Sequence, residues 1–209
     1  MSYLLCFVVI CVFLQLFYYG YSLWIKIARK YFYKKLSFRL KETFINDELI
    51  LDIGSGTGLF AEMMKGKIPG QIFCLDIYRH NRSSAPFVIA DANYLPFFDN
   101  SFDSITLFYV LHHTDNPKHL LSEACKASRN RVLIHEDVYT NQFEKMMYQI
   151  HIWSFNQLYR LCGKKAMAEN DWLKLFVELN IKDIQKFHIK RLGYPVSRRE
   201  YIIESIDKI

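Results

Sequence analysis

The sequence predicts an α/β protein built on a doubly wound, mostly parallel sheet of seven strands. From residue 47 onward, short apolar runs alternate with stretches of helical periodicity, which is the order that strand–helix–strand units require. A glycine-rich turn follows the first of these runs, as expected where a buried strand leads into a helix. With 209 residues, the chain has room for one domain of this class and not for two.

We assign residues 47–209 to this domain and expect its elements in a fixed order. Residues 48–53 form an apolar run that ends at a glycine, and residues 59–65 then follow a helical pattern. The run 103–111 is long and apolar, which favours a central strand. The other strands are expected at 71–77, 86–90, 131–135, 181–189 and 200–206, and the other helices at 119–128, 141–163 and 172–179.

The first 25 residues form an apolar segment of membrane-spanning length. No residue from 3 to 25 is charged, and a helix of this length spans about 35 Å, slightly more than the hydrocarbon core of a bilayer. A cleaved signal peptide is disfavoured, because no basic residue precedes the run and no Ala-x-Ala follows it. We expect residues 1–25 to form a transmembrane or membrane-embedded anchoring helix. The alternative is an apolar helix that docks onto the domain.

A basic segment, residues 26–46, follows the apolar run as a juxtamembrane linker or helix. It carries seven Lys or Arg residues, whereas the formal net charge of the whole chain is only +6. Positive charge on this flank predicts that the flank stays in the cytoplasm, against anionic headgroups. The sequence therefore predicts a single-pass membrane protein with its folded domain on the cytoplasmic side. Because the excess charge is confined to this segment, no nucleic-acid partner is expected.

The five cysteines are scattered, and no two have Cys-x-x-Cys spacing. Such a set predicts neither a disulfide framework nor a zinc site. It is typical of a reducing compartment, and we expect no metal centre.

The glycine-rich turn, residues 54–58, is the main candidate for a cofactor site. In open parallel sheets, ligands bind beyond the carboxyl ends of the strands, and glycines let the backbone approach a ligand closely. Dinucleotide-binding loops have Gly-x-Gly-x-x-Gly/Ala, but here the last position is Leu59, and Gly58 comes one residue too early. Asp76, about twenty residues on, suits the ribose diol of more than one cofactor. The glycines alone therefore leave an NAD(P)-dependent reductase open as an alternative.

The residues around this loop resemble class I S-adenosylmethionine-dependent methyltransferases of the small-molecule and lipid type. Asp52-Ile53-Gly54-Ser55-Gly56-Thr57-Gly58 is similar to their first motif, and the resemblance runs from residue 49 to residue 134. Further similar blocks are Ala90-Asp91-Ala92, Leu95-Pro96-Phe97, Asp99-Asn100-Ser101-Phe102-Asp103 and Val110-Leu111-His112-His113. The resemblance implies a Rossmann-like methyltransferase fold and S-adenosylmethionine (SAM) as the cofactor.

The resemblance also implies which residues hold the methionine portion of SAM. The backbone of the glycine loop is expected to line it, through Gly54, Ser55, Gly56 and Gly58. Asp52 is expected to position its amino end, where a carboxylate can meet an ammonium.

On the nucleoside side, the resemblance implies a second group of contacts. Asp76 is expected to accept hydrogen bonds from both ribose hydroxyls, and Ile77 to pack on the adenine. Asp91 is expected to bind the adenine amino group, with Ala92 at its edge, although Asp91 as a turn cap is the alternative. Apart from the resemblance, Tyr109 is expected to lie beside the base candidates at the end of the fourth strand and to contact the cofactor or the substrate.

Candidates for a catalytic base lie at the ends of the fourth and fifth strands. His112 and His113 come just after the fourth strand, and histidine titrates near neutral pH. We expect at most one of them to face SAM, because adjacent residues of an extended segment point to opposite sides. His135, Glu136 and Asp137 are expected to follow the fifth strand, with His135 structural. The alternative is that these residues bond loop backbone or face water.

The methyl acceptor is expected to be a small or lipophilic, membrane-associated molecule. Residues 138–170 are predicted to be a helical insertion that covers the substrate, and residues 141–163 within it carry five aromatic side chains. Beside a membrane anchor, such a cover suits a quinone precursor or a phospholipid headgroup. The alternatives are a membrane-anchored SAM-binding protein without catalysis and, ranked lower, a nucleic-acid methyltransferase.

Overall fold

The computed structural model of the chain describes residues 30–159, 166–182, 184–189 and 196–204, together with residues 15, 16, 19, 20, 23 and 27. The chain divides into two compact units, Met1–Leu40 and Lys41–Ile209. In the first unit, residues 30–40 are helical. Among the described residues, no helix has both the length and the apolar character needed to cross a membrane. The predicted anchor, residues 1–25, lies mostly outside the described residues.

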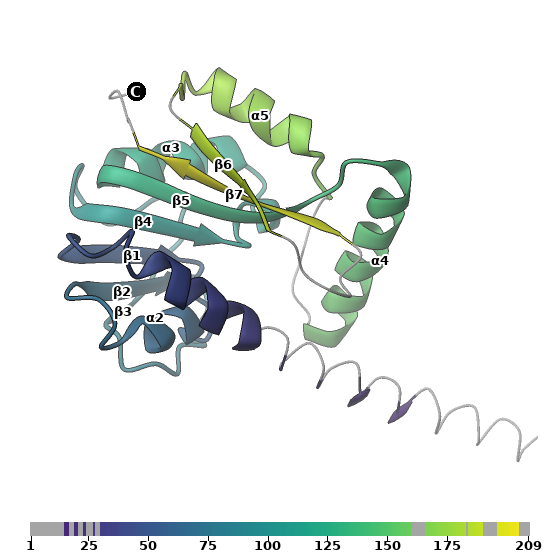
Figure 1. Cartoon of the computed structure of the whole chain (residues 1–209), viewed down its shortest axis with the longest axis horizontal. Coiled ribbons are helices and arrows are strands. Elements are labelled where there is room, and N and C mark those ends of the chain that lie inside the picture. Colours follow the sequence, from purple (N-terminus) through teal and green to yellow (C-terminus); the bar gives the residue numbers. More distant parts are fainter. Residues whose placement is uncertain are drawn as a thin grey trace, which may run out of the picture. The chain divides into compact units, whose positions relative to one another are not determined.

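The described part of the second unit alternates strands and helices, as Figure 1 shows. The strands are β1 (Leu49–Ile53), β2 (Gln71–Asp76), β3 (Phe87–Ile89), β4 (Phe102–Phe108), β5 (Ser128–Val138), β6 (Ile184–His188) and β7 (Ser197–Ile203). The helices are α2 (Leu59–Met64), α3 (Pro117–Ala127), α4 (Gln142–Tyr159) and α5 (Glu169–Glu178), and η1 (Leu111–His113) is a 3-10 turn. Each strand and helix predicted from residue 48 onward overlaps one of these elements.

The strands form one seven-stranded sheet in the order β3-β2-β1-β4-β5-β7-β6. The first five strands pair in parallel, and β7 is antiparallel to both of its neighbours. The predicted doubly wound, mostly parallel sheet of seven strands is therefore confirmed. The strand order reverses at β1, which lies between β2 and β4, so a ligand is expected beyond the carboxyl ends of β1 and β4.

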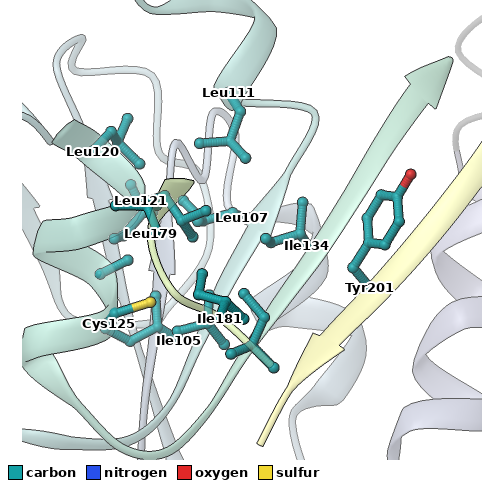
Figure 2. Close-up of a cluster of buried hydrophobic side chains, with 14 of the residues drawn as sticks. Ile105, Leu107, Leu111, Leu120, Leu121, Cys125, Ile134, Leu179, Ile181 and Tyr201 are labelled. Carbon is teal, nitrogen blue, oxygen red and sulfur yellow. The ribbon is translucent and has the colours of Figure 1, made fainter. Parts of the chain in front are cut away.

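Apolar layers cover both faces of the central strands. β1 and β4 are buried along almost their whole length, as parallel strands between two layers are. On one face, Leu121 of α3, Leu107 of β4 and Ile134 of β5 belong to one cluster (Figure 2). On the other face, the ring of Phe60 of α2 packs edge-on against Phe108 of β4, with the ring centroids 4.8 Å apart. These layers fix the strand ends and hence the loops that follow them.

Two strand ends beside the site each differ from the prediction by three residues. β4 stops at residue 108 rather than 111, because Tyr109 turns the chain with a φ of +61°. β5 continues to residue 138 rather than 135, because it stays paired with β7 over that length. The prediction that Glu136 and Asp137 follow the fifth strand is therefore wrong, since both lie within β5, as His135 does.

Candidate active site

The glycine loop after β1 adopts a conformation that side chains resist. Gly54, Gly56 and Gly58 have φ values of +66°, +55° and +71°, in the left-handed region that glycine adopts without strain. A Cβ atom at Gly54 would overlap the side chain of Val110, which follows β4. A Cβ at Gly56 would meet no described protein atom within 4 Å. The loop therefore approaches the end of β4 closely at Gly54 and leaves open space at Gly56.

Asp76, at the end of β2, holds this loop in place. Its Oδ2 atom accepts a hydrogen bond from the Gly56 amide at 2.8 Å, and its Oδ1 atom accepts one from the Tyr78 amide at 2.9 Å. Sequence reasoning identified Asp76 as a ribose ligand and missed its contact with the loop. Ile77 is 57% exposed beside it, as a residue that packs on a flat ligand would be. The structure therefore brings the loops after β1 and β2 together.

Asp52 is a buried carboxyl at the same edge of the sheet. The hydroxyl of Thr106 donates a hydrogen bond to its Oδ1 atom at 2.8 Å. Burial raises the pKa of Asp52 to about 7, with the charge of Asp76 adding to the shift and the bond from Thr106 opposing it. An arriving ammonium group would favour the charged form of this carboxyl.

We expect SAM binding to release a proton from Asp52. The unfolded carboxyl has its ordinary pKa and the folded one a raised pKa, so the folded state holds the extra proton between the two values. The stability contribution of Asp52 should therefore decline as pH rises toward about 7. Because an ammonium group pairs with the carboxylate, SAM affinity should rise about tenfold from roughly pH 6 to pH 8. Calorimetric titration with SAM, in buffers of different ionisation enthalpy, measures both the proton release and the SAM affinity.

The matched variant is Asp52→Asn, which keeps a side-chain oxygen to accept from Thr106 but cannot titrate. Its SAM affinity should be lower than that of the wild type at alkaline pH and nearly independent of pH. An affinity of the wild-type protein that stays flat over this range would contradict the role given to Asp52.

Asp91 lies in the loop after β3 and caps a turn. Its Oδ1 atom accepts hydrogen bonds from the backbone amide and from the side-chain amide of Asn93, both at 2.9 Å. Asp91 therefore caps a turn, which was the alternative to its predicted contact with the adenine amino group. Asp91 is exposed and Ala92 is half-buried, so the carboxylate is also accessible to a ligand.

Tyr109 turns the chain at the end of β4 and is strained. A φ of +61° is rare for an aromatic residue, and such residues persist where their surroundings fix them. The Tyr109 amide donates to the carbonyl of His135 at 2.8 Å, and its ring lies 5.2 Å from the His135 ring. The guanidinium of Arg198 lies 5.1 Å from the Tyr109 ring centroid. This turn directs the chain away from the sheet, toward η1.

His112 and His113 lie in η1, next to the turn at Tyr109. The expectation that they point to opposite sides is wrong, because the segment is helical rather than extended and their ring centroids are only 4.1 Å apart. The Nδ1 atom of His112 lies 2.6 Å from Oε2 of Glu136. Burial favours the neutral imidazole, but the charge and hydrogen bond of Glu136 outweigh it, so the pKa of His112 is raised. His112 thus has a buried carboxylate partner in Glu136.

Further buried charges lie where β5 pairs with β7. The Nε atom of Arg198 donates to Asp137 at 2.7 Å, and both side chains are about 6% exposed. His135 is fully buried, 3.4 Å from Glu200, and burial lowers its pKa. Sequence reasoning gave His135 a structural role, which agrees with this position, but it missed the partner charges on β7. Within the described part of the chain, no three His, Cys, Asp or Glu residues are grouped to hold a metal ion.

The glycine loop and its contacts define a class of site. A glycine loop at the switch point of a parallel sheet, bonded to an acidic residue that ends the second strand, is typical of Rossmann-like domains that bind a nucleoside cofactor. Residues 51–134 match the family model described as a methyltransferase domain. By motif, family model and fold, the chain carries a class I SAM-dependent methyltransferase domain, and SAM is the cofactor of this class.

Individual relatives agree with this assignment. The chain is 28% identical over 95 residues to a demethylmenaquinone methyltransferase of Thermotoga maritima, which is 42% of each protein. It is 32% identical over 84 residues to a ubiquinone/menaquinone biosynthesis C-methyltransferase of Desulfotalea psychrophila, which is 35% of this chain and 34% of the relative. The chain thus matches less than half the length of these relatives.

Among solved structures, the fold is similar to that of a SAM-dependent methyltransferase from Archaeoglobus fulgidus. The TM-score is 0.65 at 16% sequence identity, and the match covers 83% of this chain and 94% of that protein. The predicted Rossmann-like methyltransferase fold and the predicted cofactor are therefore confirmed.

The residues of this site fit SAM in three respects. The buried carboxyl of Asp52 suits the ammonium group of the cofactor, because burial raises its pKa and a positive partner would favour its charged form. The space beside Gly56 admits a ligand against bare backbone. The carboxylate of Asp76, with exposed Ile77 next to it, suits a ribose and an adenine ring.

Proposed function

We propose that the chain is an active SAM-dependent methyltransferase that acts on a small, lipophilic, quinone-type acceptor at a membrane. The observation that carries the proposal is the meeting of two features at the carboxyl ends of β1, β2 and β4. One is the glycine loop bonded to Asp76, which has the chemistry of a nucleoside-cofactor site. The other is the pair of His112 and Glu136, which has the chemistry of a proton acceptor.

Within this proposal, the residues predicted from the sequence hold the cofactor. They are Asp52, Gly54, Ser55, Gly56, Gly58, Asp76, Ile77, Asp91, Ala92 and Tyr109. Bound SAM would supply an electrophilic methyl group. Because the leaving group is neutral, the chain's own residues mainly orient the reactants and exclude water.

Two observations support a lipophilic acceptor. Both relatives described above are named for methylation in quinone biosynthesis or of a quinone. In addition, α4 exposes four apolar side chains at the spacing of one helix face, whereas Tyr148 of the same helix is buried. The exposed side chains are Phe143, Met146, Ile150 and Trp153. A stripe of this kind suits contact with a lipid surface.

We also propose that residues 1–25 anchor the chain in a membrane by a single pass, with the methyltransferase domain on the cytoplasmic side. The support is the uncharged run from residue 3 to residue 25 and the basic residues that follow it. An anchor of this kind would keep the domain beside membrane-resident acceptors.

Label transfer tests the proposed activity. Full-length protein in detergent, given methyl-labelled SAM and a membrane lipid extract, should move label into the solvent-extractable fraction and form an equal amount of S-adenosylhomocysteine. Asp76→Ala should lose this activity, because it removes both a loop contact and the ribose ligand. The matched variant Asp99→Ala, at an exposed carboxylate outside the site, should keep it.

Three outcomes would each contradict one part of the proposal: the catalysis, the lipophilic acceptor or the membrane anchor. SAM binding with no S-adenosylhomocysteine from any extract would contradict catalysis and favour a cofactor-binding scaffold. Label found only in water-soluble or protein fractions would contradict a lipophilic acceptor. Full-length protein that remains in solution without detergent after cell lysis would contradict the anchor.

A further inference from the structure

A cavity of about 380 Å³ opens beside the turn that follows β4. Its wall residues come from this turn and from the start of α3 on one side, and from the approach to α5 and α5 itself on the other. They include Leu111, His112, Thr114, Pro117, Met167 and Trp172. The volume lies in the range of small-molecule sites, about 300–1,000 Å³. None of the residues assigned to SAM above is among these wall residues.

The cavity begins where the contacts of the glycine loop end. The space beside Gly54 is filled by the side chain of Val110, and the next residue, Leu111, is the first wall residue. A cofactor on the glycine loop and a molecule in the cavity would therefore be neighbours, each next to the short turn that contains Val110 and Leu111. Such adjacency is what the transfer of a group between two bound molecules requires.

The walls combine apolar surface with polar groups, which include the carboxylate of Asp115 and one buried atom that has no hydrogen-bond partner among the described residues. Leu111, Pro117 and Met167 supply apolar surface. Trp172 is fully buried, and among the described residues its indole Nε1 atom has no hydrogen-bond partner. A buried N–H group without a partner is rare in folded proteins, and it is satisfied when an acceptor atom arrives. The cavity therefore suits a flat, apolar molecule that carries an oxygen atom.

Glu136 determines how His112 presents its ring to this cavity. One Glu136 oxygen lies 2.6 Å from Nδ1 of His112, and the other accepts a hydrogen bond from the Leu111 amide at 2.8 Å. Glu136 is fully buried, and the ring of Tyr148 from α4 packs edge-on against the His112 ring with centroids 6.4 Å apart. A carboxylate at Nδ1 keeps the proton there and leaves the lone pair on Nε2.

We propose that this cavity is the methyl-acceptor site and that it takes a planar aromatic molecule with an ionisable hydroxyl group, of the phenol or quinol type. Trp172 donates a hydrogen bond to an acceptor oxygen, and His112 Nε2 takes the hydroxyl proton. Glu136 acts through His112 as a positioning residue. This inference rests on the proposed methyltransferase function and adds where the acceptor lies and which residues recognise it.

The proposed step balances in atoms and electrons. The acceptor oxygen, or the ring carbon that its oxyanion activates, forms a bond to the methyl carbon. The bond from the methyl carbon to sulfur breaks, and its electron pair stays on sulfur. His112 receives the hydroxyl proton at Nε2 and later returns it to solvent. When the bond forms at the ring carbon, that carbon then loses its own proton to solvent and the oxygen regains one, so the acceptor loses one proton overall on either route. No oxidant or reductant is needed.

Trp172→Phe tests the recognition step. With naphthohydroquinone as the acceptor probe, kept reduced under argon, this variant should raise the acceptor KM roughly threefold to tenfold, the effect of one lost hydrogen bond. The kcat value and the SAM affinity should change little. The matched variant Trp153→Phe alters an exposed tryptophan on α4 and should leave KM as it is. Equal KM values for the two variants would overturn the role of Trp172.

Glu136→Gln tests the positioning step. The Leu111 amide would hold the oxygen of the new side chain, so its NH2 group would face Nδ1 and donate a hydrogen bond there. This would place the imidazole proton on Nε2 and block proton transfer. Activity should fall by about 10²–10⁴-fold, as for loss of a general base. By NMR, the pKa of His112 should drop in this variant, because the carboxylate that raises it is gone. His119→Gln, on α3, is the control for the assignment and for activity. An unchanged His112 titration, or full activity in Glu136→Gln, would overturn the proposed pair.

Fluorescence separates failure of this inference from failure of the methyltransferase function. In a Trp24→Phe/Trp153→Phe background, Trp172 is the remaining tryptophan of the three in the chain. Naphthohydroquinone should change its emission in a saturable way, and Trp172→Phe protein should give no such signal. Saturable binding supports the cavity as acceptor site even if no methyl transfer is detected. Methyl transfer to the probe without any change in Trp172 emission would overturn the cavity assignment while leaving the enzymatic function intact.

Discussion

Replacing Gly54 with alanine is expected to lower SAM affinity by about a hundredfold and to destabilise the fold. The left-handed backbone at this position costs a side chain about 1–2 kcal/mol, and overlap with the Val110 side chain adds the ~1–3 kcal/mol of an overpacked site. Relief of the overlap must separate the loop after β1 from the chain after β4, which together form the cofactor crevice. Calorimetric titration with SAM and thermal unfolding measure the two effects.

Two other glycines serve as controls for Gly54. Gly66→Ala has nearly the same backbone strain, with a φ of +70°, but its Cβ would meet no described atom within 4 Å. It should lose about 1–2 kcal/mol of stability and keep its SAM affinity. Gly56→Ala has equally open surroundings in the protein, so a loss of affinity there would report the cofactor itself. Equal SAM affinities for Gly54→Ala and Gly66→Ala would contradict the close approach at Val110.

Replacing Arg198 with leucine is expected to lower the free energy of unfolding by about 3–5 kcal/mol, because it breaks a buried ion pair with Asp137 by removing one of the two charges. Chemical denaturation of the full chain in detergent measures the loss. The ring of Tyr109 would also lose its contact with the guanidinium, so the turn after β4 should become less ordered.

The matched variant is Arg129→Leu, which breaks an ion pair of 3.0 Å with Asp103 in which the arginine is 46% exposed. Water screens such a pair, so its loss should cost about 0–1 kcal/mol. The double variant Arg198→Leu/Asp137→Asn should recover part of the lost stability, because no uncompensated charge remains. Equal destabilisation by Arg198→Leu and Arg129→Leu would refute the importance of the buried pair.

Local patterns in the sequence predict the sheet and the cofactor loop well. β1 and β4 are continuous apolar runs, and their burial on both faces follows from that pattern alone. The glycine loop is contiguous, so its spacing from Asp52 is visible before folding. Asp76 could be found as well, because it ends the neighbouring strand at the distance that nucleoside-binding domains use.

Features that depend on pairing between distant segments could not be predicted. His112 and Glu136 are 24 residues apart, and only the register of β4 with β5 brings them together. Asp137 of β5 and Arg198 of β7 form a buried pair although they are 61 residues apart in the chain. In the sequence, both look like ordinary exposed charged residues. The 3-10 turn at His112 and His113 follows from the strained backbone of Tyr109, for which the sequence has no signal.

The last strand among the described residues, β7, lies inside the sheet, between β5 and β6. While a ribosome is still making residues 189–203, β5 therefore presents an open hydrogen-bonding edge, of the kind that drives aggregation. That edge carries His135, Glu136 and Asp137, and charged residues on an open edge discourage pairing with other chains. Newly made protein should thus stay soluble through this interval, and the charge of Asp137, which later pairs with Arg198 of β7, would first serve as protection during biosynthesis.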